Sequence, residues 1–304
     1  MSSSGGNWAK AGDLAKKMRD AEKKEQDAVS DTEVNKLLAD QLADYNNRDT
    51  DAIQRILDKI VSDLGDETEG AIDLVFGGSV SKHTYVNGLS DIDALVLLNR
   101  TDLAEKSPAE LRRLLGQILS ERYGKENVVV GDLAVTVKAD GHTIQLLPAL
   151  RDGKGFKIST ADGKDWASIR PRAFAETLTK LNTKNPAVVP SIKLVKEIIS
   201  TLPSKQQLTG YHVEALAVDI FEKYDGPKTH KAMIEHFFDT VSTALRNPIT
   251  DTTGQSAHVD EYLGTANSPR RRATILALER VSRRIRNANG MRSVSQWAAL
   301  LGEE

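Results

Sequence analysis

The stretch AIDLVFGGSVSKHTYVNGLSDIDALVLL, residues 71–98, decides the fold of this chain. Its two ends, 71–76 and 94–98, are short apolar runs of the kind that form buried strands. Between them lies a polar segment that begins with a glycine pair and ends with two closely spaced acids. The stretch therefore predicts a strand, a polar loop and a second strand.

The loop has a pattern typical of triphosphate binding. Gly77 and Gly78 let the backbone approach a phosphate closely, and the Ser79 hydroxyl and the following amides can donate to its oxygens. Asp91 and Asp93 stand one residue apart at the start of the next strand, so a period of two sends both carboxylates to one face. Adjacent carboxylates repel unless a cation lies between them, and Mg²⁺ prefers one or two carboxylates plus phosphate oxygens.

The rest of the chain divides into a mixed half and a helical half. The Asp140-Gly141 pair predicts a hairpin between strands at 133–138 and 142–147. Helical spacing of apolar residues predicts helices over 8–26, 31–45, 50–64, 107–123, 171–181, 188–201, 209–224, 228–245, 269–287 and 293–301. We therefore expect an α+β catalytic lobe at 1–170, a helical lobe at 171–304, and the active site in the cleft between them.

Composition narrows the classes of protein that the chain can represent. Its 304 residues can bury a substantial core, and its net charge of -2 means that any nucleotide or nucleic-acid contact must come from a local patch. Cysteine is absent, which excludes disulfide scaffolds, thiolate metal sites and thiol nucleophiles. No apolar run is long enough to cross a bilayer and the first six residues do not resemble a signal peptide, so a cytoplasmic location without membrane contact is expected.

The loop resembles the signature of DNA polymerase β-like nucleotidyltransferases. The likeness is closest to the bacterial cGAS-like enzymes, the CD-NTases of CBASS anti-phage systems. It rests on the following residues: Gly77-Gly78-Ser79, Lys82, Thr84, Gly88 and Ser90-Asp91-Ile92-Asp93. Weaker likeness extends over Pro148-Ala149, the segment 210–215 and the segment 251–263.

The resemblance implies a nucleotidyltransferase lobe with a mixed sheet and a helical lobe beside it. It also implies an enzyme that joins ATP and other NTPs into cyclic or short linear oligonucleotide messengers and releases pyrophosphate. Such enzymes use two Mg²⁺ or Mn²⁺ ions, here held by Asp91 and Asp93, and a separate effector protein senses the product. Gly78, Ser79, Lys82 and Ser90 would hold the triphosphate.

One position departs from the family pattern. The family carries a third metal-binding aspartate on the strand after the hairpin, just before the Pro-Ala pair, and the matching residue here is Gln145. A neutral amide offers a carbonyl oxygen but no charge, and it cannot help to deprotonate an attacking hydroxyl. Three interpretations are open: a natural member that works with two carboxylates, a member that binds nucleotide without efficient turnover, and an engineered substitution.

Further candidates lie in the helical half. The resemblance suggests that Lys193 or Lys196 reaches the triphosphate and that Tyr211 stacks on a base. The alternatives are solvated lysines and a core aromatic. His83 is a phosphate contact or a surface residue, and Glu214 is expected to form a cap or an ion pair.

The C-terminal helices are rich in arginine. This region either binds phosphate or nucleic acid, or presents a solvated face whose arginines pair with acids, and we favour the solvated face. The arginines are Arg270, Arg271, Arg272, Arg280, Arg283, Arg284, Arg286 and Arg292.

Two other functions compete with oligonucleotide synthesis. One is nucleotidyl transfer to an RNA end or another acceptor, which predicts acceptor-dependent incorporation. The other is a nucleotide-binding sensor or impaired pseudoenzyme, motivated by Gln145. Whether nucleic acid is a partner is left open.

Overall fold

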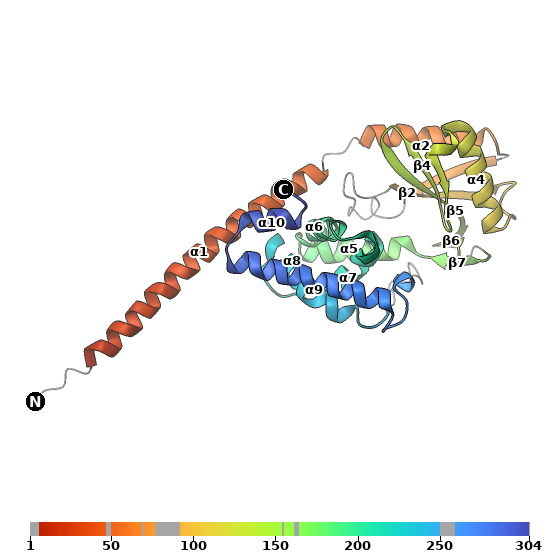
Figure 1. Cartoon of the computed structure of the whole chain (residues 1–304). Helices are drawn as coiled ribbons and strands as arrows, with labels where there is room; N and C mark the ends of the chain where they lie inside the picture. Colours follow the sequence, from red (N-terminus) through yellow and green to blue (C-terminus); the bar gives the residue numbers. More distant parts are fainter. Residues whose placement is uncertain are drawn as a thin grey trace, which may run out of the picture.

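A computed structural model describes residues 6–46, 50–68, 70–76, 92–153, 155–160, 164–249 and 259–303. Two separate hydrophobic cores within them define a sheet-containing lobe and a helical lobe. Figure 1 shows the two lobes side by side, with one long N-terminal helix that packs on the helical lobe by its last turns and otherwise extends away from it. The loop 77–91 lies outside the described residues, and only its flanking strands are placed.

The sheet is mixed, as the resemblance implies. Its strands are β1 (Gly70–Phe76), β2 (Ile92–Thr101), β3 (Val128–Val130), β4 (Val135–Ala139), β5 (His142–Asp152), β6 (Gly155–Ser159) and β7 (Trp166–Ile169). The order is β1-β2-β5-β4-β3, and β6 pairs with β5 and β7. Strands β2 and β5 are parallel, and the other pairs are antiparallel. The expected α+β class is confirmed.

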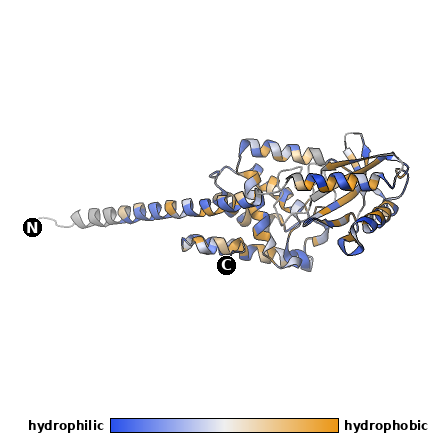
Figure 2. Ribbon diagram, turned by 90° about the horizontal axis from the view of Figure 1, so that it is seen from above, coloured by the Kyte–Doolittle hydropathy of each residue, from blue (hydrophilic) through white to orange (hydrophobic). Residues whose placement is uncertain are grey.

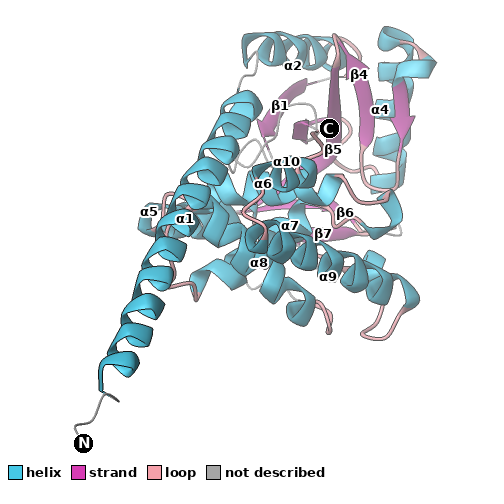
Figure 3. Cartoon of the chain, turned by 60° about the vertical axis from the view of Figure 1, so that its left-hand side comes forward, coloured by secondary structure: helices cyan, strands magenta, loops and turns pink. Residues whose placement is uncertain are grey.

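Both faces of the central strands are buried, which explains their uninterrupted apolar sequences. On β2, Ala94, Val96 and Leu98 join a core covered by helices α2 (Thr50–Gly65) and α4 (Pro108–Tyr123). Leu95 and Leu97 join a smaller cluster on the opposite face. Figure 3 shows α2 and α4 against the strands in cyan and magenta.

Helix α4 and the hairpin between β4 and β5 form where the sequence predicts them. The Ser107 hydroxyl accepts a hydrogen bond from the backbone of Glu110, and the Glu110 side chain bonds back to the Ser107 N–H, so α4 begins with a complete capping box. In the hairpin turn, Asp140 and Gly141 have φ of 48° and 80°. Positive φ at both central residues is the requirement of a type I′ turn, and the predicted hairpin is confirmed.

The sequence prediction missed the short strands β3, β6 and β7 and ended β5 too early. Strand β5 continues to Asp152, past Pro148, because its antiparallel partner changes there. Leu146 is the last residue paired with β4, and Ala149 is the first paired with β6. A proline without an N–H is tolerated at such a break in the ladder. Strands β6 and β7 have no strong sequence pattern and depend on this extension of β5.

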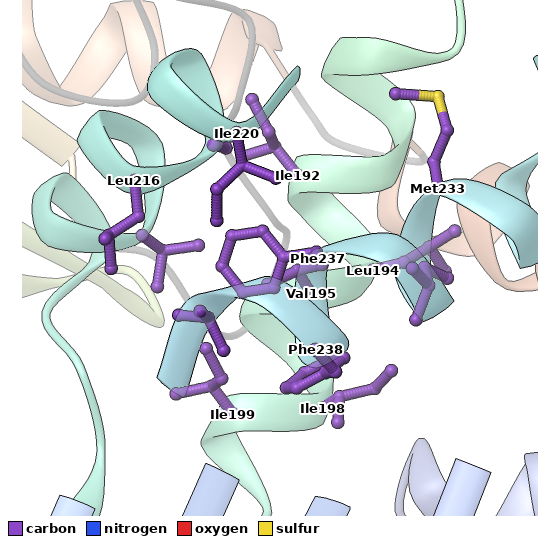
Figure 4. Close-up of a cluster of buried hydrophobic side chains, with 14 of the residues drawn as sticks. Ile192, Leu194, Val195, Ile198, Ile199, Leu216, Ile220, Met233, Phe237 and Phe238 are labelled. Atoms are coloured by element: carbon purple, nitrogen blue, oxygen red, sulfur yellow. The ribbon is translucent and has the colours of Figure 1, made fainter. Parts of the chain in front are cut away.

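The helical lobe gathers elements from both ends of the chain. Its helices are α1 (Gly6–Asn46), α5 (Pro171–Lys184), α6 (Val188–Ser200), α7 (Gly210–Glu222), α8 (His230–Ala244), α9 (Pro269–Gly290) and α10 (Val294–Leu300). Helix α6 lies at the centre, and Figure 4 shows Ile192, Val195 and Ile199 packed against α7 and α8.

Helix α1 corrects two expectations. It is one continuous helix where two were predicted, since no proline or glycine interrupts residues 26–31. Its last turns place Val34, Leu38 and Leu42 in the helical core, whereas the division at residue 170 grouped this helix with the catalytic lobe. Figure 2 shows the rest of α1 extending beyond the body of the molecule. The boundary at 170–171 stays a prediction.

None of the helices in the described residues combines the length and the apolar character that a membrane span requires.

Candidate active site

The predicted catalytic positions converge at one edge of the sheet. Strand β1 ends at Phe76, which is opposite Ala94, so the loop 77–91 leaves and re-enters the sheet at neighbouring strands. Because β2 and β5 are parallel, both begin at this same edge. Here Asp93 is in register with Gln145, and Gln145 is in turn opposite Thr136 of β4. The sheet therefore places positions 93 and 145 on adjacent strands, roughly 4.8 Å apart between strand axes.

Gln145 belongs to the face of the sheet that α2 and α4 do not cover. Its neighbours Ile144 and Leu146 are fully buried in the helix-covered core, and alternation along the strand assigns Gln145 to the other face. The side chain is half-buried there. This register agrees with the sequence-based assignment of Gln145 to the third-ligand position beside Asp93.

The remaining loop candidates, which are Gly78, Ser79, Lys82, His83, Ser90 and Asp91, lie outside the described residues. Their roles stay predictions. In the part of the chain that the structure describes, no cluster of three acidic or histidine side chains fit to hold a metal is present. The donor set expected at this edge consists of carboxylate and amide oxygens, which is the ligand chemistry that Mg²⁺ prefers.

Lys196 and Glu214 form a buried ion pair between α6 and α7. The Nζ of Lys196 donates to Oε1 of Glu214 at 2.7 Å, and the two side chains are only 5% and 1% exposed. The expectation that Glu214 forms an ion pair is confirmed. Lys193, one turn earlier on α6, is also buried. Both lysines are thus buried within the lobe, which corrects the alternative of a solvated face.

Tyr211 lies one helical turn before Glu214, at the start of α7. Its ring is 5.3 Å from that of Phe174 on α5, and it packs half-buried on the edge of the helical core. The neighbouring Gly210 faces the end of the Lys196 side chain, because a Cβ built at Gly210 would lie 3.6 Å from its Nζ. The structure therefore brings Tyr211, Lys196 and Glu214 together at the α6–α7 contact. A base-stacking role for Tyr211 stays a prediction.

A comparison with protein families identifies the chain. Residues 30–182 match the model of the Second Messenger Oligonucleotide or Dinucleotide Synthetase domain, which is half of the chain. The chain belongs to this family. The match includes Asp91, Asp93 and Gln145, and it confirms the resemblance to bacterial cGAS-like nucleotidyltransferases. No protein of curated function matches the chain in sequence.

Solved structures show the same fold over most of this chain. The Bradyrhizobium diazoefficiens CD-NTase CdnG in complex with GTP matches with a TM-score of 0.65 and 11% identity, covering 88% of this chain and 97% of that one. E. coli MS115-1 CdnC with ATP matches at 0.62 and 16%, covering 86% and 92%. Vibrio cholerae DncV cyclic AMP-GMP synthase matches at 0.60 and 13%, covering 95% and 90%.

Sequence reasoning missed a buried histidine that contacts the residues at the start of α7. The Tyr262 hydroxyl accepts the Thr209 N–H at 3.1 Å and lies 2.8 Å from Nδ1 of His212. Which of the two groups donates in the contact between the hydroxyl and Nδ1 depends on the tautomer of the ring. Burial lowers the pKa of His212 to about 4, so the ring is neutral. The family resemblance includes both segments, 210–215 and 251–263, but the sequence does not show that His212 of the first contacts Tyr262 of the second.

Several arginines of the C-terminal helices are engaged within the protein. Arg271 is fully buried, with its Nη1 2.8 Å from Oδ2 of Asp260, and it also donates to carbonyls at the end of α8 and at Gly264. Arg292 pairs with Asp27 at 2.8 Å, and Arg284 donates to the carbonyl of Ala299. The expected pairing with acids is thus found at Arg271, Arg286 and Arg292, although Arg271 is buried and not on a solvated face.

Proposed function

We propose that this chain joins nucleoside triphosphates into a cyclic or short linear oligonucleotide messenger for CBASS-like anti-phage signalling, with release of pyrophosphate. The carrying observation is the register of Asp93 with Gln145 at the edge where the Gly-Ser loop meets the sheet. Family membership supports the same reaction class.

In this proposal the loop and the two strands divide the work. Asp91 and Asp93 hold Mg²⁺ or Mn²⁺, and the amide oxygen of Gln145 is a neutral third donor. When bound, the metal neutralises triphosphate charge and stabilises the departing pyrophosphate. Gly78 and Ser79 bind the phosphates through backbone and hydroxyl donors, with Lys82 and Ser90 beside them. No protein nucleophile is needed, which agrees with the absence of cysteine.

The helical lobe supplies the other half of the substrate contacts. Lys193 or Lys196 reaches the triphosphate, and Tyr211 stacks on a base from its position at the start of α7. The buried Lys196–Glu214 pair and the Tyr262 hydroxyl hold this end of α7 in place. Similar proteins support NTP substrates, since CdnG is described with GTP and CdnC with ATP.

A second candidate function is nucleotide binding without efficient turnover. It is motivated by Gln145, which is neutral where the family pattern has a negatively charged aspartate. With Gln145, the attacking hydroxyl must lose its proton without help from a third carboxylate. Calorimetry that shows NTP binding, together with no product under any metal, would select this function over synthesis. Transfer to an RNA end, the third candidate, requires incorporation that depends on added acceptor.

The deciding experiment is an incubation with mixed radiolabelled NTPs and Mg²⁺ or Mn²⁺, resolved by chromatography after phosphatase treatment. Wild type is expected to give a phosphatase-resistant product, and Asp93→Asn is expected to give none. Gln145→Asp is expected to raise the rate about 10- to 100-fold, the range by which groups around a metal change activity. Gln117→Asp, an exposed change on α4, is the matched control.

The results separate the candidates. Product from Gln145→Asp alone identifies the natural chain as an impaired enzyme. Product from wild type and Asp93→Asn alike contradicts the proposed site. A product-sensing effector is expected as partner. CdnC is also known in a complex with HORMA-deltaN, and whether this chain has such a partner can be tested by co-purification.

A further inference from the structure

A pocket lies in the groove between α8 and α9, and the residues that line it have no role in the proposed synthesis. It has a volume of about 360 Å³ and includes Phe238, whose ring belongs to the helical core. Figure 1 shows these two helices packed along each other in the helical lobe. The groove therefore has an apolar base, and polar side chains from both helices form its rim.

Among the described residues, three arginines line this pocket, and Arg286 alone has a side-chain partner there. Arg286 lies 4.0 Å from Asp239 and donates to the Ser282 hydroxyl at 3.2 Å, while Ser282 donates to Asp239 at 2.6 Å. The guanidinium groups of Arg246 and Arg283 form no ion pair or hydrogen bond with any described residue. One arginine thus balances Asp239, and two positive charges remain against the single carboxylate of Glu279.

The lining also contains an unsatisfied hydroxyl. The Oγ of Ser242 is buried and has no hydrogen-bond partner among the described residues. Buried hydroxyls are normally satisfied, so a hydroxyl without a partner in a pocket wall indicates a missing acceptor or donor. Ser242 lies in the last turn of α8, four residues before Arg246, which follows the end of the helix. A ligand oxygen bound by Arg246 could accept the Ser242 hydrogen as well.

We propose that this pocket binds the phosphate group of a small phosphomonoester, with Arg246 and Arg283 as its cationic ligands and Ser242 as a hydroxyl donor. Guanidinium groups match phosphate oxygens in geometry and remain charged at every relevant pH. The helix dipole by itself favours a cation at Arg246, because this residue follows the C-terminus of α8. That reason does not apply to Arg283, which lies within α9 and converges on the same pocket.

The same lining argues against nucleic acid as the ligand. Asp239 and Glu279 lie among the arginines and would repel the successive phosphates of a continuous backbone. A single phosphate needs only the two unengaged arginines, and the carboxylates can accept hydroxyls of an attached sugar. The proposal is independent of oligonucleotide synthesis, because none of these residues has a role in the proposed catalytic site.

The test is calorimetry on the full chain with inorganic phosphate, ribose 5-phosphate and AMP as probes. A non-hydrolysable ATP analogue at saturation occupies the proposed catalytic site. Wild type is expected to bind one phosphomonoester per chain, and Arg246→Gln/Arg283→Gln to bind it at least about tenfold more weakly, or about 1.4 kcal/mol. Equal affinity for the three probes would mean that the pocket recognises the phosphate group alone, and tighter binding of AMP would mean that it recognises a nucleotide.

The matched control is Arg272→Gln/Arg280→Gln, which removes the same charge from exposed positions of α9 outside the pocket. It is expected to keep wild-type affinity, and the melting temperatures of both double variants should stay near that of wild type. Ser242→Ala should bind more weakly with its fold intact. No saturable binding in wild type, an equal loss in both double variants, or preferred binding of duplex DNA would each overturn the proposal.

Discussion

The buried pair between Lys196 and Glu214 makes a sharp prediction for Glu214→Gln. The bond is 2.7 Å long and its side chains are 5% and 1% exposed, so neither charge is well solvated. Removing one partner of a buried ion pair costs about 3–5 kcal/mol, because the other charge loses that partner in a low dielectric. Since whole proteins are stable by only about 5–15 kcal/mol, Glu214→Gln should remove a large part of the stability of the helical lobe.

An exposed pair in the same lobe provides the control. Arg292 and Asp27 are joined at 2.8 Å, nearly the same distance, but their side chains are 33% and 48% exposed. Breaking an exposed pair costs about 0–1 kcal/mol, so Asp27→Asn should change stability little. The contrast between the two variants isolates the effect of burial. The double variant Lys196→Met/Glu214→Leu removes both charges and should recover much of the loss.

The assay is urea unfolding followed by circular dichroism, with the free energy of unfolding obtained by linear extrapolation. Comparable losses for Glu214→Gln and Asp27→Asn would refute the reasoning, since they would mean that burial does not determine the strength of the pair. A Lys196→Met/Glu214→Leu variant whose loss equals the sum of the losses of Lys196→Met and Glu214→Leu would refute it as well, because the two charges would then act independently.

Three further predictions follow from single contacts. The pKa of His212 is about 4 in the folded protein and 6.5 in the unfolded chain, so its stabilising contribution is present above pH 6.5 and is lost as pH falls toward 4. Urea unfolding at several pH values should show that the free energy of unfolding falls by about 3 kcal/mol over this range, and the His212→Gln variant should lack this decrease. Ser107→Ala should cost about 1 kcal/mol in urea unfolding through loss of the α4 cap, with nucleotide affinity unchanged in calorimetry. Arg271→Lys should lower the melting temperature markedly, because an ammonium cannot reproduce the several hydrogen bonds that the buried guanidinium makes to Asp260 and to four separate carbonyls; an unchanged melting temperature would contradict that role.

Signals that act over a few residues were readable in the sequence. The helix that begins after Ser107, the positive-φ turn at Asp140-Gly141 and the helical spacing in α6 all depend on neighbours along the chain, and all appear in the structure. The α+β class followed from the same local patterns, and the family resemblance from one loop. Such features depend on backbone conformation and short-range hydrogen bonding, so an amino-acid pattern predicts them.

Contacts between distant segments came only from the tertiary structure. The register that sets Asp93 beside Gln145 joins strands about 50 residues apart, and α1 reaches the helical core from the other end of the chain. The burial of Lys196 against Glu214 and the convergence of Arg246 with Arg283 likewise depend on how helices pack. A sequence shows that a residue is charged or apolar, but its neighbours across a sheet or a helix pair are decided by the packing of the whole chain.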